Sequence, residues 1–453
     1  MTDATALAAA IADGRTSACA VMEATLAACE TQADLGAVVY CDTGLARALA
    51  RAADATPTEQ RGPFHGVPFL AKDLGAVAAR LPVAAGSAAL RAKAARPAID
   101  SHLFQAFAKA GLLTFGVTAT PPFGLALSSA PEDRPEARNP WNPDLTPGGS
   151  SGGAAAAVAS GLVSIAHATD AAGSIRVPAA CCGLVGLKPS RGAIPGGPDY
   201  GNHLMGLASE LVLARSVRDV RSVFERAHLP LPPVAQPAPA RIALALPDRC
   251  DATQLSAVEA AADALSDAGC HIIEISAPDT LGQEAHDIAR RILSVSLAEW
   301  MAALEICDDA LPALAASVAA EGRATTAPQL FASSRQMASL SERAHRALFA
   351  GADAVLMPVL SSSPPPVGAQ EVTDCDPDAH FARMERFAPN AALANVAGFC
   401  AIALPFGLAD HLPLGVQLLG PAGSDFNLCR LAAEIEARAP AFAFPGPIAG
   451  LPT

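Results

Sequence analysis

The sequence predicts an α/β layered fold, in which strands and helices alternate along the chain. Short apolar runs bounded by glycine or proline are typical of buried strands. Alanine-rich stretches with apolar residues at helical spacing lie between these runs. The 453 residues are 51% hydrophobic and 17% charged, a composition typical of a globular protein with a large core. Because each helix or strand must bury an apolar face, the alternation favours helices packed on a sheet.

The N-terminal part of the chain shows this alternation. Helices are expected at residues 4–30 (as two short helices), 43–55, 101–110 and from 152 onward. Strands are expected at residues 67–71 and 111–117, and Lys72 falls at or just past the end of the first. Residues 119–143 are rich in proline, aspartate, glutamate and asparagine, so they predict a loop.

The alternation resumes in the C-terminal part of the chain. Residues 228–240 are rich in proline and predict a connector. Strands are expected at residues 211–213, 241–246, 271–275, 354–360, 399–404 and 415–419. Helices are expected at residues 216–227, 253–268, through most of 282–350, and at 425–437.

Charge and cysteine content exclude several classes of protein. The net charge of −13 argues against direct binding of nucleic acid, which needs a basic surface. The 11 cysteines are odd in number and lack C-x-x-C spacing, so we expect neither a disulfide framework nor a zinc site, and the pattern fits the reducing cytoplasm. Asp3 stands where a signal peptide would carry positive charge, so we expect the N-terminus to be a helix and not a targeting segment. No clean run of about 18–20 apolar residues occurs, so no membrane span is expected.

Two serine sites flanked by small residues lie in the stretch 144–195. The first is Ser150–Ser151 in P-G-G-S-S-G-G. Glycine on both sides permits unusual backbone conformations and leaves N–H groups open to a ligand. A helix beginning at Gly152 would point its positive end back at these serines. The same pattern is also typical of a serine-capped helix start or a linker without chemistry.

The second site is Ser174, in T-D-A-A-G-S-I-R-V-P. Consecutive small residues before a serine allow a tight turn whose N–H groups face one point. Acyl-transfer enzymes use such an arrangement to stabilise a developing oxyanion. Asp170 and Arg176 flank the turn with opposite charges, and an ion pair that braces it is favoured over a catalytic role for either residue.

A serine nucleophile needs a base, and none of the ten histidines pairs obviously with either serine. His167 lies in an apolar run and is expected to be a buried, hydrogen-bonded histidine. Lys72 is the alternative base, because a buried lysine loses its charge more readily. Taken alone, such a lysine is usually a surface residue. Neighbouring side chains of an extended segment point to opposite faces, so Asp73 need not pair with Lys72.

Taken together, these motifs resemble the amidase signature family. The resemblance is carried by residues 62–73, 147–153, 169–180 and 183–192, and it continues at 394–407 and 412–421. The motif D-A-A-G-S-I-R and residues 206–219 are similar to the subgroup that contains 6-aminohexanoate cyclic dimer hydrolase. The substrate of that enzyme is not carried over to this chain.

The resemblance implies the amidase signature fold, a mixed central β-sheet covered by helices on both faces. It implies one domain over residues 1–453, with a catalytic core at about 62–220. The implied reaction is hydrolysis of a carbon–nitrogen bond in a small organic amide, linear or cyclic, through a seryl acyl-enzyme. The products are a carboxylic acid and ammonia or an amine. No cofactor and no metal are implied.

Site residues follow from the same motif matching. The resemblance implies that Ser174 is the nucleophile, Ser150 a bridging serine after a cis peptide bond, and Lys72 the base. It implies an oxyanion hole formed by the backbone N–H groups of Ala171, Ala172, Gly173 and Ser174. Structural support is expected from Ser151, Asp170 and Arg176.

Two segments depart from the family pattern. Many members have two glycines before the nucleophile, where this chain has Ala172 and Gly173. The added methyl group narrows the pocket but leaves the backbone donors in place. Residues 116–124 lack the lysine and the asparagine or glutamate often found there, which leaves their part in specificity open. Loops at 119–143, 195–210 and 361–390 are expected to shape the pocket, with Phe123, Tyr200, Phe381 and Phe387 as candidate lining residues.

Two other functions remain open at this point. One is the amidase subunit of a glutamine-dependent amidotransferase, although the residues that hold glutamine in that subunit are not matched here. The other is a non-catalytic binding protein, against which the presence of all three triad residues counts. The expected partner is a small-molecule amide in the cytoplasm, without nucleic acid or membrane, and a homodimer is one compatible assembly.

Overall fold

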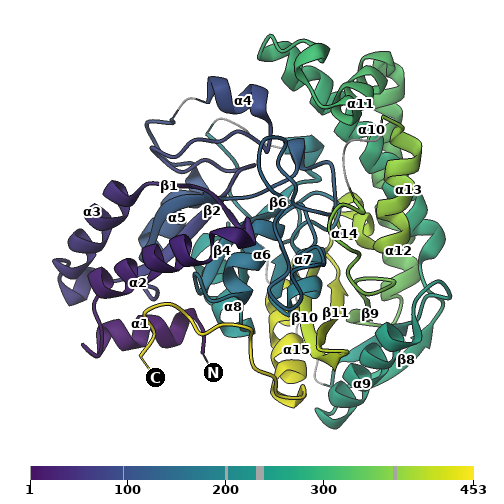
Figure 1. The fold of residues 1–453 in the computed structure, drawn as a ribbon. Coiled ribbons are helices and arrows are strands. Elements are labelled where there is room, and N and C mark those ends of the chain that lie inside the picture. Colours follow the sequence, from purple (N-terminus) through teal and green to yellow (C-terminus); the bar gives the residue numbers. More distant parts are fainter. Residues whose placement is uncertain (1, 95, 199–202, 231–238, 371–374, 453) are drawn as a thin grey trace.

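The computed structural model describes residues 2–94, 96–198, 203–230, 239–370 and 375–452. Within these residues the fold is mixed α/β, as predicted, with an eleven-stranded central sheet flanked by helices (Figure 1). The strand order is β1-β3-β2-β4-β6-β5-β10-β11-β9-β7-β8. Since six of the ten neighbouring pairs in this order are not consecutive in sequence, the sheet brings distant segments together.

The sheet combines parallel and antiparallel pairs. Strand β2 is parallel to both β3 and β4, and β7 is parallel to both β8 and β9. The remaining pairs are antiparallel, including the β10–β11 hairpin. The strands are β1 Val38–Cys41, β2 Val67–Lys72, β3 Leu112–Thr118, β4 Ile165–Asp170, β5 Val185–Lys188, β6 Ser209–Ala214, β7 Arg241–Ala245, β8 His271–Ile275, β9 Ala354–Pro358, β10 Cys400–Ala409 and β11 Leu412–Gly420.

Helices surround this sheet in groups. The N-terminal helices α1 to α3 lie at one end of the molecule, and α10 to α13 lie at the other (Figure 1). The helices are α1 Ala4–Ala12, α2 Ala18–Thr31, α3 Thr43–Asp54, α4 Ala88–Lys93, α5 His102–Ala110, α6 Gly152–Ala159, α7 Arg176–Cys182, α8 Val217–Ala227, α9 Ala252–Asp267, α10 Asp279–Ala303, α11 Ala313–Ala324, α12 Ala327–Phe349, α13 Pro377–Phe387, α14 Ala391–Ala397 and α15 Asp425–Arg438. None of the helices in the described ranges is long and apolar enough to cross a membrane.

The elements expected from periodicity are confirmed to within a few residues. Several short elements were not predicted, and they are β1, β4, β5, α4, α7, α13 and α14. Helices α7 and α14 have seven residues each and are buried on all sides, so they show no alternation of polar and apolar faces. The expected connector at 228–240 falls mostly on residues 231–238, which lie outside the described residues, as does Tyr200.

Helix α6 explains why the central stretch consists of small residues. All eight of its residues are buried. A Cβ atom at Gly153 would lie 2.4 Å from the backbone nitrogen of Ala119, so only glycine lets the helix approach the chain so closely. Strands β2 and β4 are parallel neighbours, so their carboxyl ends, at Lys72 and Asp170, reach the same edge of the sheet. The fold thereby brings Lys72 and the start of the turn that contains Ser174 to the same edge of the sheet.

Candidate active site

Lys72 ends strand β2 and has no solvent-exposed surface. Its Nζ donates hydrogen bonds to Ser150 Oγ at 2.7 Å and to Thr169 Oγ1 at 2.7 Å. Burial lowers the pKa of Lys72 to about 7, against the opposing charges of Glu210 and Asp170. A large fraction of Lys72 is therefore neutral near pH 7, and its nitrogen can then accept a proton from the Ser150 hydroxyl.

The Ser150–Ser151 segment is held by its surroundings. The Gly149–Ser150 peptide is cis, as expected from the family resemblance. A Cβ atom on Gly149 would lie 2.0 Å from the backbone oxygen of Ser128, so no other residue fits there. The Ser129 hydroxyl accepts the N–H of Gly152 at 2.8 Å. These contacts direct the Ser150 side chain toward Lys72.

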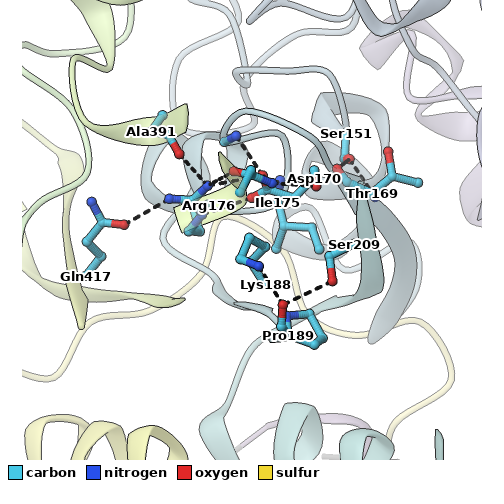
Figure 2. A network of polar contacts seen from close by, with 12 residues as sticks. Ser151, Thr169, Asp170, Ile175, Arg176, Lys188, Pro189, Ser209, Ala391 and Gln417 are labelled. Carbon is cyan, nitrogen blue, oxygen red and sulfur yellow. Dashed lines mark hydrogen bonds and ion pairs between the residues drawn. The ribbon is translucent and has the colours of Figure 1, made fainter. Parts of the chain in front are cut away.

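Ser151 has a different task from capping helix α6. Its hydroxyl donates to the backbone oxygen of Thr169 at 3.1 Å and accepts the backbone N–H of Thr169 at 3.2 Å. It makes no side-chain capping bond at the start of α6. The simple interpretation of the motif as a serine-capped helix start is therefore wrong, because this hydroxyl ties the loop to strand β4 (Figure 2).

Ser174 lies in the turn between β4 and α7, and 7% of its surface is exposed. The Asp170 carboxylate organises this turn by accepting the backbone N–H of Gly173 at 2.6 Å and of Ile175 at 3.2 Å. Gly173 has φ 114°, and a Cβ atom there would lie 2.8 Å from the Cβ of Ala391. One buried carboxylate thus holds the residues on both sides of Ser174.

The bond between Gly173 and Asp170 corrects one expectation. The N–H groups of residues 171–174 were expected to face one point together, but the N–H of Gly173 is already donated to Asp170 Oδ1. Ala171, Ala172 and Ser174 make no backbone N–H bond to an acceptor in the described ranges. The set of free donors in this turn is therefore narrower than the sequence suggested.

Arg176 braces the turn, and its ion pair with Asp170 confirms the expectation (Figure 2). Both side chains are buried. Burial alone would raise the pKa of Asp170, but the charge of Arg176, together with the hydrogen bonds from Arg176 and from the Gly173 N–H, lowers that pKa to about 2. The guanidinium also donates to the Ala391 oxygen at 2.7 Å, to Asn395 Oδ1 at 2.8 Å and to Gln417 Oε1 at 3.2 Å. These bonds attach the turn to helix α14 and strand β11.

Asp73 and His167 also behave as expected. The Asp73 carboxylate points away from Lys72 and accepts the backbone N–H groups of Ala84 at 2.6 Å and Gly86 at 3.0 Å. His167 is fully buried and hydrogen bonded, with its Nδ1 accepting the backbone N–H of Lys72 at 3.2 Å. Cys181 and Cys182, which are adjacent in sequence, are also buried, and burial raises the pKa of both thiols.

Some residues at the site were not identified from the sequence. Thr169 accepts a bond from Lys72 Nζ, and Glu210 bonds to His167 at 2.9 Å. Thr169 belongs to a motif that was already under consideration, so its polar side chain was an available signal. Glu210 belongs to the segment 206–219 that carries part of the family resemblance, but its place beside His167 depends on the pairing of strands β4 and β6, which the sequence does not specify.

The segment Pro122–Gly124 lies beside the serine pair. A Cβ atom on Gly124 would be 3.4 Å from Ser150 Oγ and 2.7 Å from a methyl carbon of Leu74. Phe123, with φ 56°, packs edge-on against Trp300 of helix α10 with ring centroids 5.8 Å apart. The apolar segment Pro122–Gly124 therefore lies next to Ser150, and it is the segment where the sequence departs from the family pattern.

The chain is similar in sequence and in structure to known amidases and amide hydrolases. Residues 20–429 match the amidase family. The putative amidase AmiC of Mycobacterium tuberculosis is 32% identical over 97% of this chain and 94% of its own length. The 6-aminohexanoate-cyclic-dimer hydrolase of Paenarthrobacter ureafaciens is 30% identical over 97% and 95%. A solved structure of 6-aminohexanoate cyclic dimer hydrolase matches with a TM-score of 0.90 at 28% identity, covering 97% of each chain.

Proposed function

Since this chain belongs to the amidase family and hydrolyses carbon–nitrogen bonds in amides, we propose that Lys72, Ser150 and Ser174 perform the reaction. The observation that carries this proposal is the contact between the buried Lys72 Nζ and Ser150 Oγ at 2.7 Å. A buried amine with a lowered pKa is a competent base near neutral pH. The parallel pairing of β2 and β4, which end at Lys72 and Asp170, supports the proposal.

In the proposed mechanism Ser174 is the nucleophile. Neutral Lys72 takes the proton of Ser150, and Ser150 takes the proton of Ser174 as the Ser174 oxygen attacks the amide carbon. The carbon–nitrogen bond breaks, the proton returns through Ser150 to the leaving nitrogen, and ammonia or an amine departs. The acyl group remains on Ser174 as an ester. Water then attacks this ester with the same proton relay, which releases the carboxylic acid and restores the Ser174 hydroxyl.

The oxyanion hole is proposed to consist of the N–H groups of Ala171, Ala172 and Ser174. Gly173 is left out of the donors because Asp170 accepts its N–H. One such donor is worth roughly 3–4 kcal/mol in acyl-transfer enzymes. Ser151, Asp170 and Arg176 act as supports, since their bonds fix the two loops that carry the serines.

We also propose that residues 1–453 form a single amidase signature domain with its catalytic core at about 62–220. The continuity of one sheet through the described residues supports this. The substrate is proposed to be a small organic amide, in keeping with relatives named for a cyclic dimer. A cytoplasmic location is supported by the eleven cysteines, all of which are free.

Mass spectrometry of the acylated enzyme tests the mechanism. The wild-type protein is screened against a panel of linear and cyclic amides, quenched in acid and digested. An acyl group is expected on the peptide that contains Ser174. The Ser174→Ala variant should fold normally and lose about 10⁵-fold or more in kcat.

Ser160→Ala is the matched control, because the hydroxyl of this buried serine donates to the Ala157 oxygen at the end of helix α6. It should retain the rate of the wild type. Acylation at another residue, or a Ser174→Ala variant within tenfold of the wild-type rate, would contradict the assignment.

A further inference from the structure

A second buried ionisable pair, His167 and Glu210, lies against the proposed base. We propose that Glu210 is a positioning residue for Lys72: with His167 it fixes the lysine backbone, and as a buried anion it sets the pH at which the lysine starts to act as a base. This inference rests on the proposed role of Lys72 in catalysis. It concerns residues that lie outside the serine motifs.

The register of the sheet places Glu210 opposite a residue that contacts the lysine amine. Strands β4 and β6 are antiparallel, and Thr169 is directly opposite Glu210. Side chains of directly opposed residues emerge on the same face of a sheet. Thr169 in turn accepts a hydrogen bond from Lys72 Nζ at 2.7 Å. The carboxylate of Glu210 is therefore the cross-strand neighbour of a direct partner of Lys72.

Gly75 leaves room for this arrangement three residues after Lys72. A Cβ atom on Gly75 would lie 2.6 Å from Cγ2 of Thr169 and 2.8 Å from Oε2 of Glu210. Both side chains thus press against the bare backbone of the glycine. The next residue, Ala76, donates its backbone N–H to Glu210 Oε2 at 2.8 Å. Glu210 therefore also binds the backbone of the segment that follows Lys72 in sequence.

His167 connects Glu210 to the backbone of Lys72. The ring Nδ1 accepts the N–H of Lys72 at 3.2 Å, so this nitrogen carries no proton. The proton must then be on Nε2, which lies 2.9 Å from Glu210 Oε2 and donates to it. The imidazole is neutral, and the carboxylate accepts N–H groups from His167 and Ala76. Such bonds favour the ionised form of a carboxyl group.

The charges around Lys72 come from several elements. Strand β4 contributes Asp170 and neutral His167, β6 contributes Glu210, and helix α6 contributes no titratable side chain. Asp73, which directly follows the last residue of β2, binds the 84–86 turn instead. Arg176 is paired with Asp170, and Lys188 of strand β5 is buried and donates to the Pro189 oxygen. His203 lies in the short segment His203–Gly206. Burial lowers the pKa of His203, and the charge of Glu210 partly opposes this lowering.

Among these groups Glu210 has the largest effect in raising the pKa of Lys72, against the lowering by burial. Burial lowers the pKa of Lys72 to about 7, while Glu210 and then Asp170 raise it. Asp170 is paired with Arg176, and Glu210 accepts N–H groups from His167 and Ala76. Removing the charge of Glu210 should therefore make Lys72 easier to deprotonate.

The test is the pH dependence of kcat/KM for Glu210→Gln, measured on an amide that the wild type hydrolyses. Glutamine keeps the size and the acceptor oxygen but not the charge. Loss of an opposite charge should move the acid limb of the profile to lower pH by about 1–2 units. Glu210→Asp keeps the charge and should leave the limb near its wild-type position. His203→Gln checks that the shift does not come from the neighbouring histidine.

Asp73→Asn is the matched control, because it removes a buried carboxylate next in sequence to Lys72 that points elsewhere. Its acid limb should not move. An acid limb that is unchanged or moved to higher pH in Glu210→Gln would overturn the proposal. If that variant does not fold, Glu210→Met supplies a second uncharged side chain of similar volume, with the same expected shift. Failure of both to fold would also overturn it, since Glu210 would then be needed for the fold itself.

Lys72→Met separates this inference from the proposed function. If Lys72 is not the base, this variant keeps activity and keeps its acid limb, and the proposed mechanism fails. If Lys72 is the base but Glu210 does not tune it, Lys72→Met is inactive while Glu210→Gln has the wild-type profile. The two failures are thereby distinguished.

Discussion

Arg176 and Asp170 form a bidentate ion pair in the protein interior, with 2.9 Å between Nε and Oδ2 and 3.1 Å between Nη2 and Oδ1. The Asp170 carboxylate also holds the backbone on both sides of Ser174. The position of the proposed nucleophile therefore depends on a buried charge pair and not on its own side chain. Several measurable consequences come from this dependence and from the burial of Lys72.

Replacing Arg176 with methionine should destabilise the protein strongly. The substitution leaves the Asp170 carboxylate buried without its counter-charge, and breaking a buried pair in this way costs about 3–5 kcal/mol. The free energy of unfolding, measured with urea, checks this value. Arg221→Met is the control, because Arg221 pairs with Glu225 on the exposed surface of α8, where such pairs contribute about 0.3–0.5 kcal/mol. Similar losses in the two variants would contradict the bracing role.

The same pair predicts how stability depends on acid. Burial opposes ionisation, but the charge and hydrogen bonds of Arg176 and the Gly173 N–H together lower the pKa of Asp170 to about 2 in the folded protein. The unfolded value is about 3.9, so the contribution of Asp170 is fully present above about pH 4 and is lost as the pH falls through about 2. The Asp170→Asn variant lacks this contribution, so its unfolding free energy should fall less steeply between these values. Asp263→Asn, on the exposed face of α9, should keep the wild-type slope.

Activity should depend on the neutral form of Lys72. Because burial lowers its pKa to about 7, kcat/KM should fall about tenfold per pH unit below that value and level off above it. Lys72→Arg should lose about 10²–10⁴-fold or more, since a guanidinium does not give up its proton. Lys109→Arg, on the exposed face of α5, should have the rate and pH profile of the wild type. An unchanged profile in Lys72→Arg would exclude a lysine base.

The absence of a side chain at Gly75 should be required for activity, in addition to the positive φ of this residue. Gly75 and Gly269 both have positive φ, 103° and 86°, so alanine at either position costs roughly 1–2 kcal/mol in backbone strain. Only at Gly75 would the new methyl group also meet Thr169 and Glu210. We expect Gly75→Ala to lower kcat more than tenfold, and Gly269→Ala to lower stability with little change in kcat. Equal kcat values in the two variants would show that the contacts of Gly75 are unimportant.

The order of the main helices and strands could be predicted because it depends on neighbouring residues. Val67 to Ala71 is apolar between a glycine and Lys72, so a buried strand and the position of the lysine at its end could be read directly. Helix α7 could not, because it is buried on every side and offers no polar face. The small residues around Ser150 and Ser174 gave the two loops, but not the donation of the Gly173 N–H to Asp170.

The sequence by itself determined which motifs are present, their order along the chain and the family to which they belong, because these depend on local spacing of residue types. The tertiary structure decided how Lys72 is surrounded. Thr169, His167 and Glu210 reach the lysine through the pairing of strands β2, β4 and β6, and no local pattern specifies that register. The lowered pKa of Lys72 is likewise a property of the packed interior, because desolvation exists only after distant segments have excluded water from the amine.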